Sequence, residues 1–294
     1  MQAFVAINDA GSLTAAADRL DRSLPSVVRT LAALEAALGV RLLNRTTRRI
    51  ALTDEGRQYL ERCRRILAEV EEAERALTAG RVEPEGRLTV TAPVLFGQMH
   101  VAPVLNEFLG RFTRVRVELL LLDRVTRLVD EGLDAAVRIA HLPDSSMVAV
   151  PVGEMRRVVC ASPAFLAAHG RPGHPKAVSA HPCIGFTGLA GAGAWHFRAD
   201  GRALSVPVDG RFSCNQAAAS VAACVAGLGF GMFLSYQVAL QVRSGALEVV
   251  LEAFEPPPTP VSIVYPQARL LSARVRAFVD WTAAGLRERD WGQI

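Results

Sequence analysis

The sequence is poor in the features that mark secreted, membrane-bound or disulfide-stabilised proteins. Its five cysteines are scattered, with no CxxC pair and no framework spacing, which predicts reduced, buried thiols. No apolar run reaches the roughly 18 residues that a membrane-spanning helix needs, and the first residues lack the pattern of a signal peptide. Lysine is almost absent, since Lys176 is the only one, and arginine supplies nearly all of the positive charge. These absences favour a cytoplasmic protein.

Motifs that indicate catalysis or a cofactor are missing as well. No GxSxG nucleophile elbow occurs, and the glycines of 185–193 are not followed by the GK[ST] of a phosphate loop. His174, His181 and Cys183 are close in sequence, but they fall in a Pro/Gly-rich stretch without metal-ligand spacing. A redox pair of Cys183 and Cys214 has no activating neighbour in the sequence. We therefore expect no enzyme, no metal site and no cofactor.

Apolar residues, in contrast, are plentiful. They make up 50% of the 294 residues, which is enough for a small domain and a larger two-lobed one. The formal net charge is only +4, but four arginines lie between residues 41 and 49. This local concentration is better evidence for an anionic partner than the net charge is.

Residues 12–39 have the pattern of two helices joined by a tight turn. Ser12 is a suitable N-cap for an alanine-rich helix, and 21–23 has the length of the turn in a helix-turn-helix motif. Ser23 can cap the second helix, and Pro25 falls in its first turn, where a missing N–H costs little. Gly39 is a plausible C-cap.

The second helix of this pair is predicted to have two different faces. At about 100° per residue, Leu31, Leu34 and Leu38 fall within about 40° of Val27 and form one apolar stripe. The opposite face is small and polar, carries one guanidinium, and can therefore enter a major groove about 12 Å wide. The residues placed at the groove are Ser23, Pro25, Ser26 and Arg29.

Residues 40–53 have two short apolar arms around a basic tip, which is the pattern of a wing. Arginines at such a tip suit phosphates or a narrow minor groove. A solvated loop is the alternative interpretation of an arginine-rich turn taken alone. The residues expected to contact the DNA backbone or the minor groove are Arg45, Thr46, Arg48 and Arg49.

Segments of this region resemble the N-terminal signature of the LysR-type transcriptional regulators. They are residues 4–7, 11–17, 34–35, 38–45 and 52–56. The resemblance implies a bacterial regulator with a winged helix-turn-helix DNA-binding domain at 1–57, a linker helix and hinge at 58–86, and an effector-binding domain at 87–294. Val28 departs from the family, because many members carry a polar residue there. Base readout would then depend on Arg29, Ser26 and apolar contacts.

A long helix is expected to follow, from Thr53 as its N-cap to about Ala79. Apolar residues recur along it with the spacing of a coiled-coil seam, which Glu74 interrupts. Those residues are Leu60, Cys63, Leu67, Val70 and Leu77. We predict a dimerising linker, because a single helix-turn-helix reads only one half-site. The alternative is a helix that packs against its own domain.

From residue 87 onward, strands and helices alternate in a way that predicts parallel βαβ units. The expected fold is α/β overall, with an N-terminal all-α winged helix-turn-helix and a two-lobed C-terminal domain. Lobe I is placed at 87–157 and 262–294, and lobe II at 158–261. Among the expected elements are helices at 126–131 and 163–170, and strands at 184–187 and 205–212. Residues 134–138, 160–163, 195–197, 200–201 and 227–229 resemble the LysR effector domain, which shares the fold of type 2 periplasmic binding proteins.

Small molecules bind α/β sheets at the carboxyl ends of the strands and between lobes. The candidate effector-binding residues at such positions are Thr91, Phe96, Gly97, Asp123, Arg138, Ser213, Asn215 and Gly229. Backbone N–H groups near 96–97 and the charge of Arg138 would suit an anionic effector. A salt bridge from Arg138 to Asp134 or Asp123 is the structural alternative.

The expected function is sequence-specific binding of double-stranded DNA, controlled by a small-molecule effector. The family resemblance implies a homodimer or homotetramer, adds RNA polymerase as a candidate partner, and implies no membrane. The alternative is a small-molecule-binding protein or enzyme whose N-terminal domain serves only association.

Overall fold

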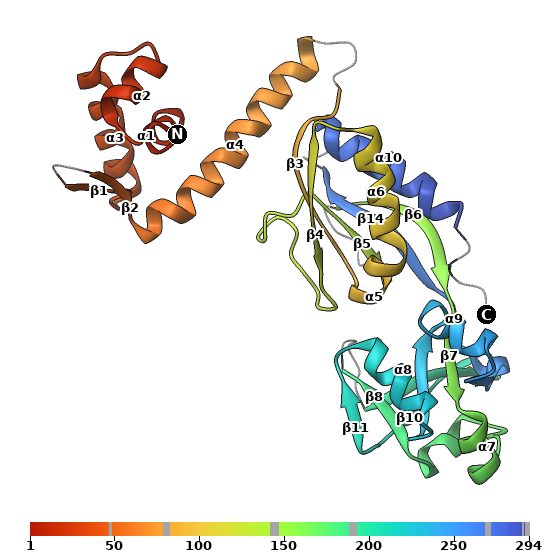
Figure 1. Cartoon of the computed structure of the whole chain (residues 1–294). Helices are drawn as coiled ribbons and strands as arrows, with labels where there is room; N and C mark the ends of the chain where they lie inside the picture. The colour runs from red at the N-terminus through yellow and green to blue at the C-terminus, as the bar shows by residue number, and fades with distance from the viewer. Residues whose placement is uncertain are drawn as a thin grey trace. The chain divides into compact units, whose positions relative to one another are not determined.

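The computed structural model describes residues 1–46, 49–78, 83–141, 147–187, 193–267, 272–289 and 291. The chain separates into two compact units, Met1–Val82 and Glu83–Ile294 (Figure 1). Each unit has a buried core of its own, so each is described separately. No helix within the described ranges is both long and apolar enough to traverse a lipid bilayer.

The N-terminal unit consists of three helices, a short hairpin and a long helix. These elements are α1 (Gln2–Ala10), α2 (Leu13–Arg19), α3 (Leu24–Leu38), β1 (Leu43–Thr46), β2 (Arg49–Leu52) and α4 (Asp54–Thr78). Ser12 caps α2 by accepting a hydrogen bond from the N–H of Ala15 at 3.2 Å, as predicted. Ser23 occupies the N-cap position of α3, but its side chain makes no capping hydrogen bond. Gly39 ends α3 with a φ of 69°, a left-handed conformation that favours glycine.

The core of this unit joins the three short helices to the hairpin and to the beginning of α4. On α3, the predicted apolar stripe is confirmed at Val27 and Leu31, which are almost completely buried. Leu34 is partly buried against the same core, whereas Leu38 is 41% exposed. Gly56, in the first turn of α4, lies so close to the carbonyl of Leu42 that a Cβ there would overlap it, so this close approach requires glycine.

The first turns of α4 pack against their own unit. Leu60 and Cys63, predicted as seam residues, are buried in the core beside α1, so their assignment to an intermolecular seam is wrong. Further along, Ile66 and Val70 are 42% and 47% exposed. Leu77 has a side chain outside the described part of the chain. Only the section of α4 beyond the domain core therefore leaves apolar groups for a partner.

The C-terminal unit is built on two five-stranded sheets (Figure 1). The first has the order β4 (Val115–Leu121), β3 (Gly86–Ala92), β5 (Ala135–Ile139), β14 (Thr259–Pro266) and β6 (Met147–Met155). The second has the order β11 (Phe212–Cys214), β8 (Cys183–Phe186), β12 (Phe230–Leu234), β7 (Arg157–Ala161) and β13 (Glu248–Val250). A separate hairpin, β9 (Ala194–Ala199) with β10 (Arg202–Pro207), completes the half built on the second sheet. We call the part built on the first sheet lobe I and the part built on the second lobe II.

The prediction of parallel βαβ units is right for only part of each sheet. Strand β3 is parallel to β4 and β5, and β8 is parallel to β11 and β12. Strand β14 is antiparallel to both of its neighbours, and β7 is antiparallel to β12 and β13. These antiparallel pairs occur where the chain crosses between lobes, from β6 to β7 and back from β13 to β14.

Helices cover both sheets. Lobe I has α5 (Val94–Phe96), a π-helical turn (Gly97–Val101), α6 (Ala102–Arg111) and α10 (Ala273–Arg287). Lobe II has α7 (Pro163–His169), α8 (Ala217–Val225) and α9 (Ser235–Arg243), with short 3-10 turns at Pro175–Ala180 and Glu252–Phe254. The apolar residues of lobe II fall into two clusters, because its sheet is packed on both faces.

Some predicted elements are wrong. The segment 126–131 is a turn rather than a helix, closed by a 2.8 Å hydrogen bond from the N–H of Leu133 to the carbonyl of Leu128. The predicted strand 205–212 is divided between β10 and β11. Strand β6 was missed because Pro151 and Gly153 are unfavourable in strands. The register of β14 shifts opposite these two residues, and this bulge accommodates them.

Candidate nucleic-acid interface and ligand pocket

The outward face of α3 is exposed and is small in cross-section. Ser23, Pro25 and Arg29 are exposed, Ser26 is half-buried, and Val28 is half-buried beside it. The Nε of Arg29 donates to the carbonyl of Pro25 at 3.3 Å, which directs the side chain along the helix. Because this is the bond made by Nε, the two terminal nitrogens of the guanidinium remain available for a base edge or a phosphate.

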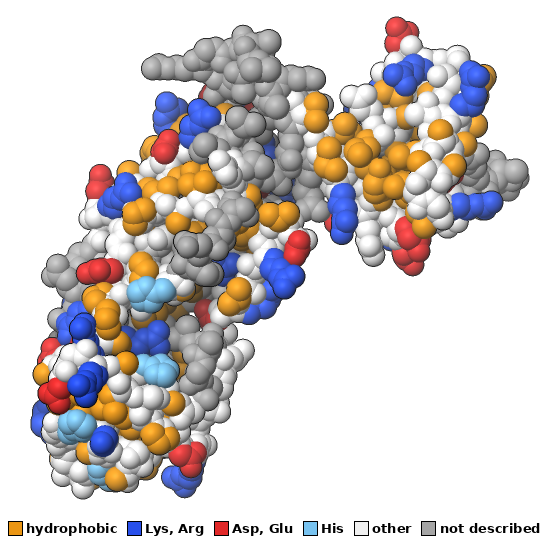
Figure 2. All heavy atoms as spheres, turned by 180° about the vertical axis from the view of Figure 1, so that it is seen from behind, with side chains coloured by type: hydrophobic (Ala, Val, Ile, Leu, Met, Phe, Trp, Pro, Cys, Tyr) orange, Lys and Arg blue, Asp and Glu red, His pale blue; other side chains and the backbone are white. Residues whose placement is uncertain are grey.

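Some arginines of this unit form ion pairs, and others do not. Arg57 and Arg64 on α4 are neutralised by ion pairs with Asp54 and Asp9. Arg29, by contrast, makes no ion pair within the described part of the chain, and the same holds for the exposed Arg22 and Arg41. On the face seen in Figure 2, basic and acidic side chains are interspersed. Attraction to a polyanion on such a surface depends on local unpaired groups such as Arg29.

Two polar side chains connect the entry into the hairpin to the helices before and after it. The carboxylate Oε1 of Glu35 accepts the N–H groups of Leu42 at 2.8 Å and Leu43 at 3.2 Å. The hydroxyl of Thr53 donates to the carbonyl of Arg41 at 2.8 Å and accepts the N–H of Gly56 at 2.9 Å. Glu35 therefore connects the end of α3 to the entry into the hairpin. Its role was missed in the sequence because it acts over seven and eight residues.

We expect Glu35→Ala to weaken this connection, because two half-buried N–H groups lose their acceptor. Amide exchange at Leu42 and Leu43 should become faster by roughly 5- to 150-fold, which corresponds to about 1–3 kcal/mol. Hydrogen exchange followed by mass spectrometry measures this directly. Glu35→Gln is the matched control, since its amide oxygen still accepts, and it should change exchange much less. Unchanged exchange in Glu35→Ala would show that the hairpin is held by other contacts.

The hairpin itself pairs Leu43 with Leu52 and Thr46 with Arg49. This antiparallel pairing is the backbone arrangement of a wing. Thr47 and Arg48 lie outside the described residues, and so do the side chains of Arg45, Thr46 and Arg49. Their proposed contacts with DNA therefore remain predictions.

In lobe I the predicted effector residues gather at one end of the sheet, but several have structural roles. Thr91 is 1% exposed, and its hydroxyl has no hydrogen-bond partner among the described residues. The carboxylate of Asp123 accepts the N–H of Val94 at 2.9 Å and so caps α5. The N–H of Gly97 donates to the carbonyl of Pro93 at 2.7 Å. The N–H of Gly97, one of those expected to be offered to an anion, is therefore already used.

Arg138 is half-buried in the same region. Its guanidinium donates to the carbonyl of Thr126 at 3.1 Å and to the hydroxyl of the same residue. Neither carboxylate expected as its partner is used: Asp123 accepts from Val94, and Asp134 accepts the N–H of Thr89 at 2.8 Å. Burial lowers the pKa of Arg138, although the charge of Glu131 acts in the opposite direction. Among the described residues no carboxylate is hydrogen-bonded to this half-buried guanidinium.

An aromatic cluster lies behind these residues. The Phe96 ring is fully buried and stands edge-on to Tyr236 and Trp291, with ring centroids 5.2 and 5.6 Å away. His100 adds its ring at 4.9 Å from Phe96. Tyr236 lies at the start of α9, so the cluster joins lobe I to the segment that follows β12. Phe96 is thus a packing residue of the core.

His100 should make unfolding depend on pH. Burial, and secondarily the charge of Arg289, lower the pKa of His100, and its Nε2 has no hydrogen-bond partner in the described part. As the pH falls below about 6.5 the unfolded chain then binds up to about one more proton at this residue than the folded chain, so stability decreases until the lower folded pKa is passed. In His100→Phe the dependence of the unfolding free energy on pH should be weaker over this window. Equal slopes in denaturant titrations of both proteins would contradict this.

In lobe II the predicted residues are separated. Ser213 and Asn215 are exposed at the end of β11. Gly229 is at the entry into β12, not at a carboxyl end, and a Cβ there would overlap the carbonyl of Pro182. The predicted role of Gly229 in ligand binding therefore has no support from its position. His181 packs its ring on Phe230, with centroids 5.7 Å apart.

Two family models match the chain. Residues 1–57 match the model described as bacterial regulatory helix-turn-helix protein, lysR family, and residues 81–287 match the LysR substrate binding domain. The chain belongs to the LysR family of transcriptional regulators. The family predicted from residues 4–56 is confirmed, and the alternative of an enzyme is excluded by this membership.

Individual relatives agree with this assignment. An HTH-type transcriptional repressor of Pseudomonas aeruginosa is 35% identical over 283 residues, covering 96% of this chain and 89% of the relative. The regulator PtxR of the same species is 34% identical over 95% of this chain and 90% of its own length. The solved structure of CrgA, a LysR-type transcriptional regulator from Neisseria meningitidis, is 30% identical with a TM-score of 0.63, and 97% of each chain is covered. The predicted fold, a helix-turn-helix followed by a two-lobed α/β effector domain, is confirmed.

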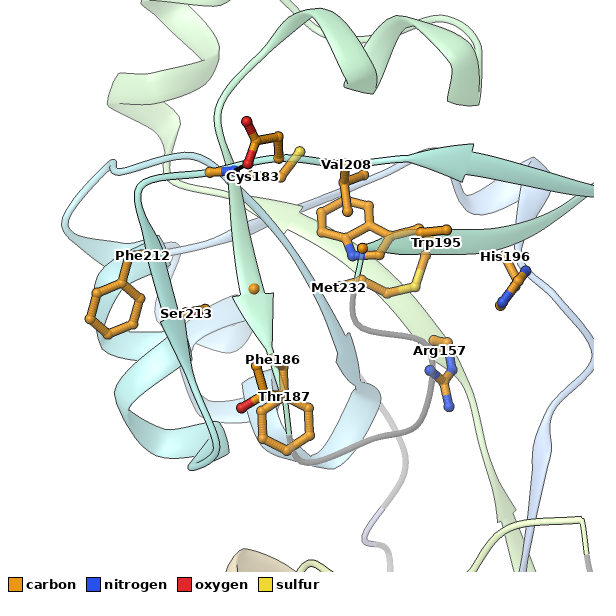
Figure 3. Close-up of a pocket in the computed structure, with 15 residues that line it drawn as sticks. Arg157, Cys183, Phe186, Thr187, Trp195, His196, Val208, Phe212, Ser213 and Met232 are labelled. Carbon is orange, nitrogen blue, oxygen red and sulfur yellow. Dashed lines mark hydrogen bonds between the residues drawn. The ribbon is translucent and has the colours of Figure 1, made fainter.

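The effector domain of this LysR-type regulator contains a pocket that the sequence did not indicate. It has a volume of about 270 Å³ and lies in lobe II between the sheet and the β9–β10 hairpin (Figure 3). Of the predicted effector residues, Ser213 lines it. In the view of Figure 3, Arg157 and His196 lie on one side, and Phe212 and Ser213 on the other. Its wall combines polar side chains such as Arg157, His196 and Asp209 with apolar ones such as Trp195 and Met232.

Proposed function

We propose that this regulator recognises a specific double-stranded DNA sequence with the outward face of α3. Ser23, Pro25, Ser26 and Arg29 would contact the major groove, with Arg29 as the principal reader of a base edge. The observation that carries this proposal is the exposed, unpaired guanidinium of Arg29 on a face without bulky side chains. The wing residues Arg45, Thr46, Arg48 and Arg49 would contact the DNA backbone or the minor groove.

We further propose that the protein acts in the cytoplasm as a homodimer or homotetramer joined through α4. The exposed Ile66 and Val70 support a partner on the later part of this helix. The domains would be the DNA-binding domain at 1–57, the linker and hinge at 58–86, and the effector domain at 87–294, with lobe I at 87–157 and 262–294 and lobe II at 158–261. RNA polymerase is a candidate partner at the promoter.

An effector is proposed to bind in the two-lobed domain and to shift the arrangement of the subunits on DNA. The half-buried Arg138 supports a site at the carboxyl end of the first sheet, with Thr91, Phe96, Gly97 and Asp123 around it. Ser213, Asn215 and Gly229 would be contributed by lobe II in this arrangement, although Gly229 is poorly placed for it.

Binding of the full chain to its own upstream intergenic DNA, compared with random DNA over a salt series, tests the proposal. Specific binding that falls steeply with salt is expected, because each neutralised phosphate releases counterions. Equal affinity for both DNAs at every salt concentration would contradict sequence-specific recognition.

A further inference from the structure

The pocket of lobe II has an unpaired cation in its wall. Arg157 lines the pocket, and its half-buried guanidinium makes no ion pair or hydrogen bond to any described residue. Burial lowers the pKa of Arg157, and no carboxylate of a described residue offsets this cost. A partly desolvated cation without a partner costs stability unless an anion reaches it.

The preceding residue, Arg156, does form ion pairs, so of these two arginines only Arg157 is without a described partner. The Nε of Arg156 donates to Glu255 at 2.9 Å, and its Nη2 donates to Glu255 at 2.7 Å and to Glu252 at 3.1 Å. These bonds neutralise Arg156. Two adjacent arginines thus differ completely: one closes a protein ion pair and the other faces a pocket.

The other walls of the pocket define what kind of anion fits. Trp195 is buried and Met232 is half-buried in the same apolar cluster, and Phe186 is a further half-buried lining residue. A bare inorganic anion would leave these surfaces without contacts, whereas a flat apolar body would cover them. The volume of about 270 Å³ is at the small end for ligand sites, which suits a molecule with a single ring.

Charge also gives the ligand a direction. Asp209 lines the pocket beside Cys183, whose N–H donates to the Asp209 carbonyl at 2.9 Å. Its carboxylate would repel an anion from that end. Arg157 is at the start of β7 and Cys183 at the start of β8, and these two residues are well separated in Figure 3.

We propose that this pocket binds a small planar carboxylate about one ring in size, with its carboxylate on Arg157 and its apolar body against Trp195 and Met232. The inference deepens the proposed function, and rests on it only where the bound molecule is called an effector. A guanidinium and a carboxylate can form two parallel hydrogen bonds, and this fixes the plane of the ligand.

The position of Arg157 connects ligand binding to the crossover between the lobes. Arg157 directly follows Arg156, whose carbonyl accepts the N–H of Ser235 at 2.9 Å and whose side chain holds Glu255 just before β14. Both crossings between the two sheets therefore meet at Arg156. A carboxylate bound to Arg157 therefore lies next to the segments that join the two lobes.

Benzoate is the probe, titrated into the full chain without DNA by isothermal calorimetry. We expect binding with a dissociation constant on the order of 1 mM or tighter. Arg157→Gln should weaken it by roughly 10- to 100-fold, and Arg157→Lys should retain part of the affinity. The matched control is Arg202→Gln, an exposed arginine of the β9–β10 hairpin that does not line the pocket, and it should leave affinity unchanged.

Benzamide and inorganic phosphate complete the test. Benzamide has the same ring without the charge and should bind much more weakly, and phosphate should not displace benzoate. The proposal is overturned if benzoate shows no binding at about 10 mM. Equal binding of benzoate by Arg157→Gln, or equal binding of benzamide, would overturn it too. The titration contains no DNA, so it tests this proposal separately from DNA recognition. A protein that binds benzoate but does not bind its upstream DNA would contradict only the proposed function.

Discussion

Phe96→Ala is expected to lower the free energy of unfolding of the effector domain by about 3–5 kcal/mol. The ring is fully buried and contacts His100, Tyr236 and Trp291, so its removal leaves a cavity between α5, α9 and the C-terminal segment. Differential scanning calorimetry of the full chain should show the effector-domain transition at a clearly lower temperature.

Met99→Ala is the matched control, because Met99 lies in the π-helical turn directly after α5 but is 37% exposed. It should shift the transition little. This pair also separates two interpretations of Phe96. If Phe96→Ala kept its stability but lost its response to a ligand, Phe96 would be an effector contact rather than a packing residue.

Arg29→Ala should reduce affinity for the specific operator by about 1–3 kcal/mol and should relax the sequence preference at one base pair. The reason is that the guanidinium is exposed on the helix face and is not committed to a carboxylate. Competition binding between the operator and its single-base variants measures both effects.

Arg48→Ala provides the comparison, because a phosphate contact carries no sequence information. It should weaken specific and random DNA alike and should reduce the salt slope by about one unit. If Arg29→Ala and Arg48→Ala changed specific and random DNA equally, the assignment of α3 to the major groove would be wrong.

The N-terminal unit was predictable because its signals are local. The cap at Ser12, the left-handed Gly39 and the stripe at Val27 and Leu31 each depend on residues within one or two turns. The role of Glu35 is different, since its carboxylate reaches N–H groups in the next element. Leu60 and Cys63 were assigned to the wrong partner because heptad spacing does not tell an intermolecular seam from a core of the same chain.

The fold class of the effector domain was predictable from the sequence, but the position of its pocket was not. Strand β6 was hidden by Pro151, which a bulge accommodates only in the presence of β14. Ser213 was identified from a strand end, but Arg157 and Trp195 were not, because the hairpin and the sheet that bring them together are far apart in sequence. Two successive arginines before an apolar strand were the available signal, and only the ion pairs of Arg156 show which one is free.

The place of β14 in the first sheet has a consequence for synthesis on the ribosome. It lies between β5 and β6, yet it begins at Thr259, after every strand of the second sheet has been made. A nascent chain therefore completes lobe II while the first sheet still lacks an inner strand and exposes two unpaired edges. We expect lobe I to close last, when Thr259–Pro266 emerges, so a chaperone that protects open sheet edges would act on this protein late in translation.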